Sequence, residues 1–331
     1  VIVAIAIVPC AVGLVQWGLS NAIGYRRAIE LFYGAAAAAA TQQFGRFDFG
    51  TDLFRIPSTF TFIAGYSGFT LSMLVPTYAL IRLDPSPMWR RFGRVMLGVV
   101  IVSALLSGAR ANFIFVPLLM ALILALDARL KGIVAGLLLL PPFLLAVLEV
   151  SGLRLSAIVT GTGTLVSHYK SDLIIPAVID AMRSWPMGQG SGMNTGAARH
   201  VMSAVAAQRF SPVESYYARA IIELGIPGFL VLLSLFAGIA LHGFTCLMTT
   251  ADRAHRSCAA AMLAYLIVII FHSLKGWQID ADPVNIYFWL FAGVLYKLPL
   301  LASAPAANHG EFAPTAGRRS TVRTPQHQPA A

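Results

Sequence analysis

Apolar stretches with almost no charge recur along the whole chain and constrain its fold more than any other feature. Only 11% of the 331 residues are charged and 57% are hydrophobic, whereas soluble domains carry about 25% charged residues. A chain of this length with so few charges cannot build a solvated surface, so its surface must face lipid. This excludes an ordinary soluble enzyme, a disordered chain and a nucleic-acid-binding domain. It predicts an all-α fold, a polytopic bundle of transmembrane helices.

Crossing the hydrocarbon region of a bilayer takes about 20 apolar residues in a helix. The stretch Val95–Leu126, uncharged except for Arg110, is too long for one such helix and short for two. The other candidate spans are Val1–Leu19, Thr59–Ile81, Gly132–Val150, Ile221–Met248, Ser257–Leu274 and Pro283–Ala302.

Basic residues in the loops decide how Val95–Leu126 crosses. If it forms a hairpin of two helices, the loops Arg82–Arg94, Asp127–Lys131 and Thr249–Arg256 all lie on one side, as the positive-inside rule requires. A single helix would place the last two loops outside, against that rule. We therefore expect a hairpin and about eight spans within residues 1–302.

Both ends of the chain then lie on the cytoplasmic side, and two longer segments, Asn21–Pro57 and Ser151–Arg219, lie outside. Long loops are usually functional or disordered, and the aromatic content of Ser151–Arg219 favours an ordered extracytoplasmic loop. Residues 303–331, rich in Ala, Pro, Thr and Gln, predict a disordered cytoplasmic tail. Because Val1 lies inside an apolar run, we expect that the natural chain begins earlier.

Basic residues also gather on the predicted outer face. Arg110 lies at the hairpin turn between two apolar helices, and a charge there usually marks a partner or a substrate. Its planar fork suits a phosphate or a carboxylate. For the others the plain alternative is that translocated loops are exempt from the positive-inside rule and their charges are solvated. These others include Arg55, Lys170, Arg209 and Arg219.

The segment Pro186–Gly192 has glycine at every second position, namely Gly188, Gly190 and Gly192. Glycines in this pattern let a backbone turn sharply and approach an oxyanion closely. A tight surface turn without a ligand is the alternative, since no P-loop lysine follows the segment.

Two carboxylates follow, Glu214 at the end of the long loop and Glu223 at the mouth of an apolar stretch. A carboxylate partly removed from water can serve as a general base. The two are nine residues apart, so on one helix they would face different directions and form no retaining-glycosidase pair. For Glu223 the alternative role is a salt bridge or a cap in the first helical turn.

Taken in order, these motifs resemble those of the O-antigen ligase and O-antigen polymerase family of bacterial membrane proteins. The resemblance covers roughly residues 45–300. The motifs that carry it are Arg55-Ile56-Pro57-Ser58-Thr59-Phe60, Ser107-Gly108-Ala109-Arg110, Pro186 to Gly192, and Glu214-Ser215-Tyr216-Tyr217 followed by Glu223-Leu224-Gly225-Ile226-Pro227-Gly228.

The resemblance implies a fold similar to C-type glycosyltransferases, with the site on the outer face of the bacterial inner membrane. It implies a polyprenyl-diphosphate-linked glycan as substrate, and neither a nucleotide sugar, a metal nor another cofactor. Cys10, Cys246 and Cys258 likewise lack metal-ligand spacing. Membrane lipid, a flippase and a chain-length regulator are the implied partners, with no nucleic acid among them.

In the implied reaction, Arg110 and Lys170 hold the diphosphate leaving group while Glu214 activates the acceptor hydroxyl. One displacement with one carboxylate predicts inversion at the anomeric carbon. The implied substrate-binding residues are Arg55, Gly188, Gly190, Gly192, Arg209, Tyr217, Arg219 and Glu223.

Two departures from the family pattern favour a polymerase of exopolysaccharide or O-antigen repeats. Lys170 stands where an arginine is expected, and Glu214 stands where ligases typically have histidine, although His168 or His200 offers a histidine base. The alternative is an O-antigen ligase that transfers glycan to lipid A core. A transporter is the alternative from another class. It predicts charges near the bilayer midplane and symmetric halves, whereas the charges here gather on one face and the sequence has no repeat.

Overall fold

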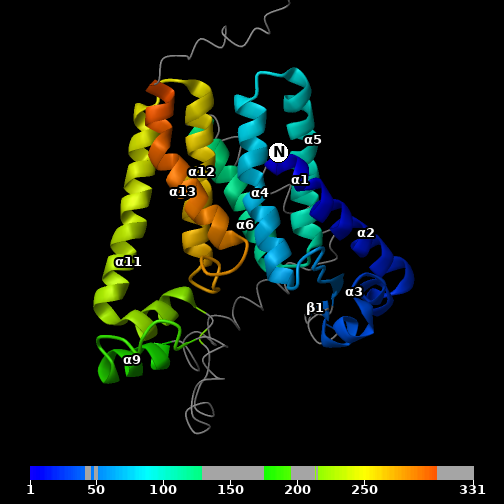
Figure 1. Ribbon diagram of the computed structural model, residues 1–331, viewed down its shortest axis with the longest axis horizontal. Coiled ribbons are helices and arrows are strands. Elements are labelled where there is room, and N and C mark those ends of the chain that lie inside the picture. Colours follow the sequence, from blue (N-terminus) through cyan, green and yellow to red (C-terminus); the bar gives the residue numbers. More distant parts are fainter. Residues whose placement is uncertain (42–45, 48–50, 129–174, 195–212, 214, 304–331) are drawn as a thin grey trace, which may run out of the picture.

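The computed structural model describes residues 1–41, 46–47, 51–128, 175–194, 213 and 215–303. The described chain is a helical bundle with one small strand hairpin (Figure 1), which confirms the predicted helical class. Several predicted features lie outside the described residues, namely Lys170, Arg209, Glu214, the span Gly132–Val150 and the tail beyond residue 303.

The described part of the chain contains ten helices and two short strands. In chain order the helices are α1 (Ile2–Ile5), α2 (Ile7–Ile23), α3 (Tyr25–Thr41), α4 (Ile63–Leu83), α5 (Pro87–Leu106), α6 (Arg110–Ala128), α9 (Ile175–Ser184), α11 (Tyr216–Thr249), α12 (Arg253–His272) and α13 (Val284–Ser303). Strands β1 (Arg46–Phe47) and β2 (Thr51–Phe54) pair antiparallel between α3 and α4.

Among the described residues, three helical segments are long and apolar enough to cross a membrane. They are Ile2–Ile23, which combines α1 and α2, and the helices α11 and α12. Shorter apolar helices cover Ala111–Asp127 in α6 and Val284–Leu300 in α13. These lengths are compatible with a membrane protein, whereas the count of eight spans stays a prediction.

The stretch Val95–Leu126 belongs to two separate helices, α5 and α6, as the charge distribution predicted. The turn between them is short because Gly108 takes a left-handed conformation with φ of 71°. The predicted loop Arg82–Arg94 is too long, because α4 extends to Leu83. Helix α5 already begins at Pro87, where proline is favoured in a first turn, so Arg90, Arg91 and Arg94 stand on the helix.

The two ends of the bundle carry different segments (Figure 1). The α4–α5 and α11–α12 turns lie at one end, and the α5–α6 turn, the α12–α13 connection and α9 lie at the other. We call the first the basic end, which contains residues 84–94 and 249–256. The second is the motif end, which contains residues 54–60, 106–110, 186–194 and 273–283. The basic segments therefore share one end of the bundle, as predicted.

Helix α12 lies at the centre of the bundle and packs against α4, α6, α11 and α13. Its Ala259, Ala260 and Ala261 are fully buried, and small side chains let neighbouring helices approach closely. Tyr265 is buried with them, and its hydroxyl lies 2.7 Å from the Ser72 hydroxyl of α4. Helix α12 therefore fixes the relative positions of the helices around it.

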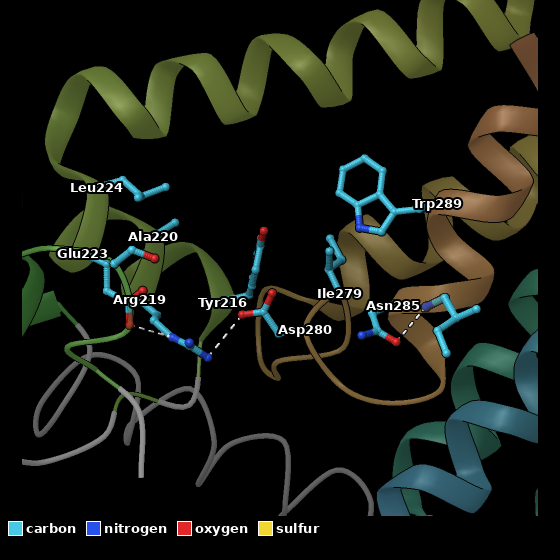
Figure 2. A pocket seen from close by; sticks show the side chains of 11 residues that line it. Tyr216, Arg219, Ala220, Glu223, Leu224, Ile279, Asp280, Asn285 and Trp289 are labelled. Carbon is cyan, nitrogen blue, oxygen red and sulfur yellow. Dashed lines mark hydrogen bonds and ion pairs between the residues drawn. The ribbon is translucent and has the colours of Figure 1, made fainter. Parts of the chain in front are cut away.

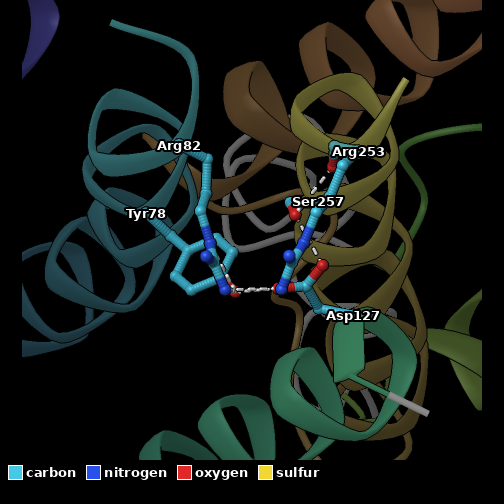
Figure 3. A network of polar contacts seen from close by, with 5 residues as sticks. All are labelled: Tyr78, Arg82, Asp127, Arg253 and Ser257. Atoms are coloured by element: carbon cyan, nitrogen blue, oxygen red, sulfur yellow. Dashed lines mark hydrogen bonds and ion pairs between the residues drawn. The ribbon is translucent and has the colours of Figure 1, made fainter.

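A buried polar cluster joins α4, α6 and α12 near the basic end (Figure 3). Asp127 accepts a hydrogen bond from the Tyr78 hydroxyl at 2.6 Å and pairs with Arg82 at 2.5 Å. The Ser257 hydroxyl lies 2.5 Å from Asp127 and 2.9 Å from the Arg253 carbonyl oxygen. A carboxylate is stable in an apolar bundle only when it is paired and hydrogen-bonded, and this cluster satisfies Asp127.

Replacing Asp127 by asparagine should destabilise the bundle, because breaking a buried ion pair leaves a charge uncompensated. The Arg82 side chain is 36% exposed, so water screens part of that loss, and we expect a cost of about 1–3 kcal/mol. Tyr78→Phe removes the hydrogen bond donated to Asp127 and those accepted from Arg82, and should cost about 1–2 kcal/mol. Thermal unfolding of the purified protein in detergent measures both costs. An Asp127→Asn protein as stable as the parent would contradict the role given to the cluster.

Candidate functional site

Two of the predicted motifs meet backbone to backbone at the motif end. The Ile56 N–H donates a hydrogen bond to the Ser107 carbonyl oxygen at 3.0 Å. A Cβ on Gly108 would overlap the β2 backbone and lie 3.0 Å from the Arg55 Cα, so only glycine fits this turn. The contact places the Arg55 backbone beside the N-terminus of α6, which begins at Arg110. The Arg110 side chain lies outside the part of the structure that is described.

A buried glutamine that sequence reasoning missed holds the first motif in place. Gln16 of α2 accepts a hydrogen bond from the Ser58 N–H at 2.9 Å, and its amide donates to the Ser58 carbonyl oxygen at 3.2 Å. These bonds hold Ser58 at φ of 54°, a conformation that is uncommon outside glycine. The signal that identifies Gln16 is a single amide inside a long apolar span.

The glycine-rich segment crosses α11 in direct backbone contact. Helix α11 kinks at Gly225, where φ is 68°, and a Cβ there would overlap the Pro186 carbonyl oxygen. A Cβ on Gly188 would in turn lie 2.6 Å from the Gly225 nitrogen. Two hydrogen bonds flank the crossing. The Gly190 N–H donates to the Glu223 carbonyl oxygen at 3.0 Å, and the Ile226 N–H donates to the Pro186 carbonyl oxygen at 3.0 Å. The third and fourth motifs therefore form one structural unit.

The Glu223 carboxylate receives the backbone donors of this glycine-rich turn. Its oxygens accept hydrogen bonds from the Gly192 and Asn194 N–H groups, both at 2.9 Å. The Arg219 Nε donates to the same carboxylate at 2.9 Å, which confirms the alternative of a salt bridge. In this structure the anion at the turn is thus the protein's own carboxylate. Direct contact of Gly188, Gly192 and Glu223 with substrate stays a prediction.

Arg219 bridges two carboxylates, and the second was not predicted. Its Nη1 lies 3.1 Å from Asp280 in the α12–α13 connection (Figure 2). Burial raises the pKa of the Asp280 carboxyl, Arg219 lowers it, and Glu223 raises it further, with a raised pKa as the net result. No spacing in the sequence relates Asp280 to Arg219, so only the fold reveals this pair.

A pocket of about 640 Å³ opens beside this bridge, a size typical of small-molecule sites. Arg219, Glu223 and Asp280 form its charged side, and Trp289 of α13 is the large aromatic residue on its wall (Figure 2). The lining residues are Ser191, Tyr216, Arg219, Ala220, Glu223, Leu224, Ile279, Asp280, Asn285, Ile286 and Trp289. The pocket therefore combines charged and polar groups with apolar and aromatic side chains.

Val213 and Ser215, near the start of α11, are each held by hydrogen bonds. The Val213 N–H donates to the Asn194 side-chain oxygen at 3.0 Å, and the Val213 carbonyl oxygen accepts from the Trp277 indole at 2.6 Å. Ser215 caps α11 through its hydroxyl. Glu214 lies outside the described residues, so its role as the base stays a prediction.

Of the two adjacent tyrosines, Tyr216 lines the pocket. Tyr217 donates its hydroxyl hydrogen to the Ile270 carbonyl oxygen at 2.9 Å and packs against Phe229 and Phe236. Consecutive residues of a helix face directions about 100° apart, and the two rings meet edge to face with centroids 5.8 Å apart. Direct contact of Tyr217 with substrate stays a prediction.

No model of a known protein family matches the chain, and no curated protein is similar enough to count as a relative. Within the described ranges, no group of three His, Cys, Asp or Glu side chains is placed to hold a metal ion.

Alanine at Gly225 should damage the crossing, since both the positive φ and the overlap with Pro186 exclude a Cβ. We expect a loss of about 1–3 kcal/mol in the free energy of unfolding. Gly238 lies in the regular part of α11, and nothing lies within 4 Å of a Cβ there. Gly238→Ala is the matched control and should be neutral or stabilising by up to about 1 kcal/mol. Equal effects of the two substitutions would show that the crossing carries no special constraint.

Asp280 should make the folded state less stable as the pH rises. Its folded pKa lies above the ordinary value of 3.8, so the folded state binds the proton more readily than the unfolded state. Stability is then lost as pH rises from about 4 through the folded pKa. Asp280→Asn removes this loss, so the variant should gain in unfolding temperature relative to the parent across that window. A variant that falls increasingly below the parent would mean that the Arg219 ion pair outweighs burial.

Proposed function

We propose that the protein is a glycosyltransferase of the bacterial inner membrane that joins polyprenyl-diphosphate-linked oligosaccharide repeats at the outer face. The product would be an exopolysaccharide or an O-antigen. The observation that carries the proposal is the pocket at the motif end, where Trp289 and Tyr216 meet a bridge of Arg219 between two carboxylates.

The chemistry of the pocket supports a sugar ligand. Aromatic rings offer apolar faces to a pyranose, and Asp280 and Asn285 offer hydrogen-bonding groups for its hydroxyls. Leu224 and Ile286 add exposed apolar side chains to the lining, as a wall that faces lipid would. A glycan carried on a lipid needs both a polar and an apolar side.

The charge of the pocket indicates which part of the substrate lies there. Among the described residues that line the pocket, one guanidinium, Arg219, faces the two carboxylates Glu223 and Asp280, so this part of the lining has a net negative charge. A diphosphate would be repelled, whereas a hydroxylated sugar would not. We therefore place the acceptor sugar in this pocket and the diphosphate near Arg55 and Arg110, where the first two motifs meet.

The proposed reaction is a single displacement. The acceptor hydroxyl oxygen attacks the anomeric carbon of the donor, and the bond from that carbon to the diphosphate oxygen breaks. The hydroxyl proton passes to a carboxylate, for which Glu214 is the proposed base. The diphosphate leaves with the bonding electron pair, and basic side chains such as Arg110 and Lys170 stabilise its charge.

A direct assay tests the proposal. The purified protein is incubated with a polyprenyl-diphosphate oligosaccharide, without nucleotide sugar and with a chelator present, and the glycan length is measured. We expect elongation that falls about 10²–10⁴-fold in Glu214→Gln, as for loss of a general base. Arg110→Ala should also abolish most of it. Asp280→Asn should raise the KM for the acceptor more than it lowers kcat.

Matched controls lie on α3, where Glu30 and Arg27 are exposed charges. Glu30→Gln and Arg27→Ala should leave elongation unchanged. Undiminished elongation in Glu214→Gln and Arg110→Ala would overturn the assigned site. Transfer only to lipid A core would replace the polymerase by a ligase. Movement of the intact lipid-linked glycan across vesicles, without elongation, would replace it by a transporter.

A further inference from the structure

A second pocket, of about 370 Å³, lies at the basic end of the bundle, away from the proposed sugar site. It lies between the end of α4 and the first turns of α5, and it is lined by Ile81, Pro87, Arg90, Arg91 and Arg94. The three arginines are exposed. Three of the five residues that line this pocket are therefore arginines.

The charges of these arginines are not neutralised by nearby carboxylates. In the described part of the chain, no salt bridge involves Arg90, Arg91 or Arg94. Arg82, at the end of α4, differs because it pairs with Asp127. Three uncompensated like charges around one pocket repel one another, and an anion bound between them relieves the repulsion.

Orientation in the membrane does not by itself explain this arrangement. The positive-inside rule requires basic residues near the end of a span. The rule is satisfied whichever way their side chains point. It does not require them to converge on one pocket, nor that all three be arginine. Arginine suits phosphate because its planar fork donates two parallel hydrogen bonds.

An exposed apolar stripe continues along α5 from the arginines. Met88, Val95 and Val102 follow one another at seven-residue spacing and are 65%, 66% and 47% exposed, so they share one face of the helix. Arg91 lies on the same face between the first two. Gly98 lies between the last two, with nothing within 4 Å of the place where a Cβ would be. A lipid chain can lie in this notch while its headgroup reaches the arginines.

We propose that the pocket of Arg90, Arg91 and Arg94 binds the headgroup of an anionic phospholipid, with one acyl chain along Val95 and Val102. The phosphate accepts hydrogen bonds from the guanidinium groups, and the N-terminus of α5 adds a favourable partial charge. Basic pockets at helix ends on the cytoplasmic side recognise such headgroups. The site is independent of the proposed glycosyl transfer.

Native mass spectrometry of the delipidated protein in detergent tests the site. The probes are dioleoyl phosphatidylglycerol and dioleoyl phosphatidylcholine. We expect the parent to bind the anionic lipid at least tenfold more tightly. The triple variant Arg90→Gln, Arg91→Gln, Arg94→Gln should lose about a hundredfold of that affinity, because each basic residue near a lipid surface contributes roughly fivefold. Equal binding of both lipids by the parent, or unchanged binding by the triple variant, would overturn the proposal.

The matched control is Arg253→Gln with Arg256→Gln, which removes two arginines from the same end of the bundle but not from the pocket. It should keep the preference for phosphatidylglycerol. Loss of the preference in the control would show a diffuse charge effect and no site. Circular dichroism and thermal unfolding without lipid check that the triple variant is folded. If it is not, the single variant Arg91→Gln, at the centre of the stripe, replaces it with an expected loss of several-fold.

Two soluble probes separate a lipid from a free phosphate. Glycerophosphoglycerol, the headgroup without chains, should compete only weakly, because the apolar stripe contributes to binding. Inorganic diphosphate should likewise fail to displace the lipid at equal concentration. Displacement by diphosphate at that concentration would assign the pocket to a soluble phosphate and overturn the lipid proposal.

Discussion

The backbone crossing between the glycine-rich turn and the kink of α11 determines the geometry of the motif end. Gly188 and Gly225 approach so closely that neither tolerates a side chain. The kink turns the first two turns of α11 away from the long membrane-compatible part of the helix, so that Arg219 faces the α12–α13 connection. The same crossing brings the backbone donors of the turn to Glu223. Without it, the pocket would lose one wall and its charged bridge together.

Arginine has opposite functions at the two ends of the bundle. At the motif end, Arg219 is held between Glu223 and Asp280, so its charge is compensated and it acts mainly to position two carboxylates. At the basic end, Arg90 and Arg94 share a pocket in which no carboxylate takes part. The net charge of each site therefore differs in sign, and so does the chemistry that each can accept. A count of basic residues conceals this difference because it sums over both ends.

The sequence predicted the helical class, the hairpin of α5 and α6, and the side of the bundle on which the basic loops lie. Those predictions rest on hydropathy and loop charge, which are properties of segments. It failed for Asp280 and Gln16, because each acts through a partner far away in the chain and no local pattern connects the pair. Of the two tyrosines in the fourth motif, only the helical register of α11 reveals that Tyr216 lines the pocket, and substrate contact by Tyr217 stays a prediction. The start of α5 was placed too late because charge was taken to exclude helix, although Ser86-Pro87 is a recognisable helix start.

The two motif pairs are connected through α4, which gives the proposed donor and acceptor regions one common support. In the first pair, Arg55 lies on the segment that leads into the N-terminus of α4, and Gly108 of the α5–α6 turn contacts that segment. The α12–α13 connection, which carries Asp280, rests on the same end of α4, where Gly68 leaves room for Val284 and Gly65 lies close to the residue 282 carbonyl oxygen. A larger side chain at Gly68 would push this connection outward and with it the wall of the pocket. The distance between the region proposed for the diphosphate and the region proposed for the sugar is thus set by close packing on one helix. Because such packing is rigid, the two substrates would meet at a fixed separation, which is what a single displacement between them requires.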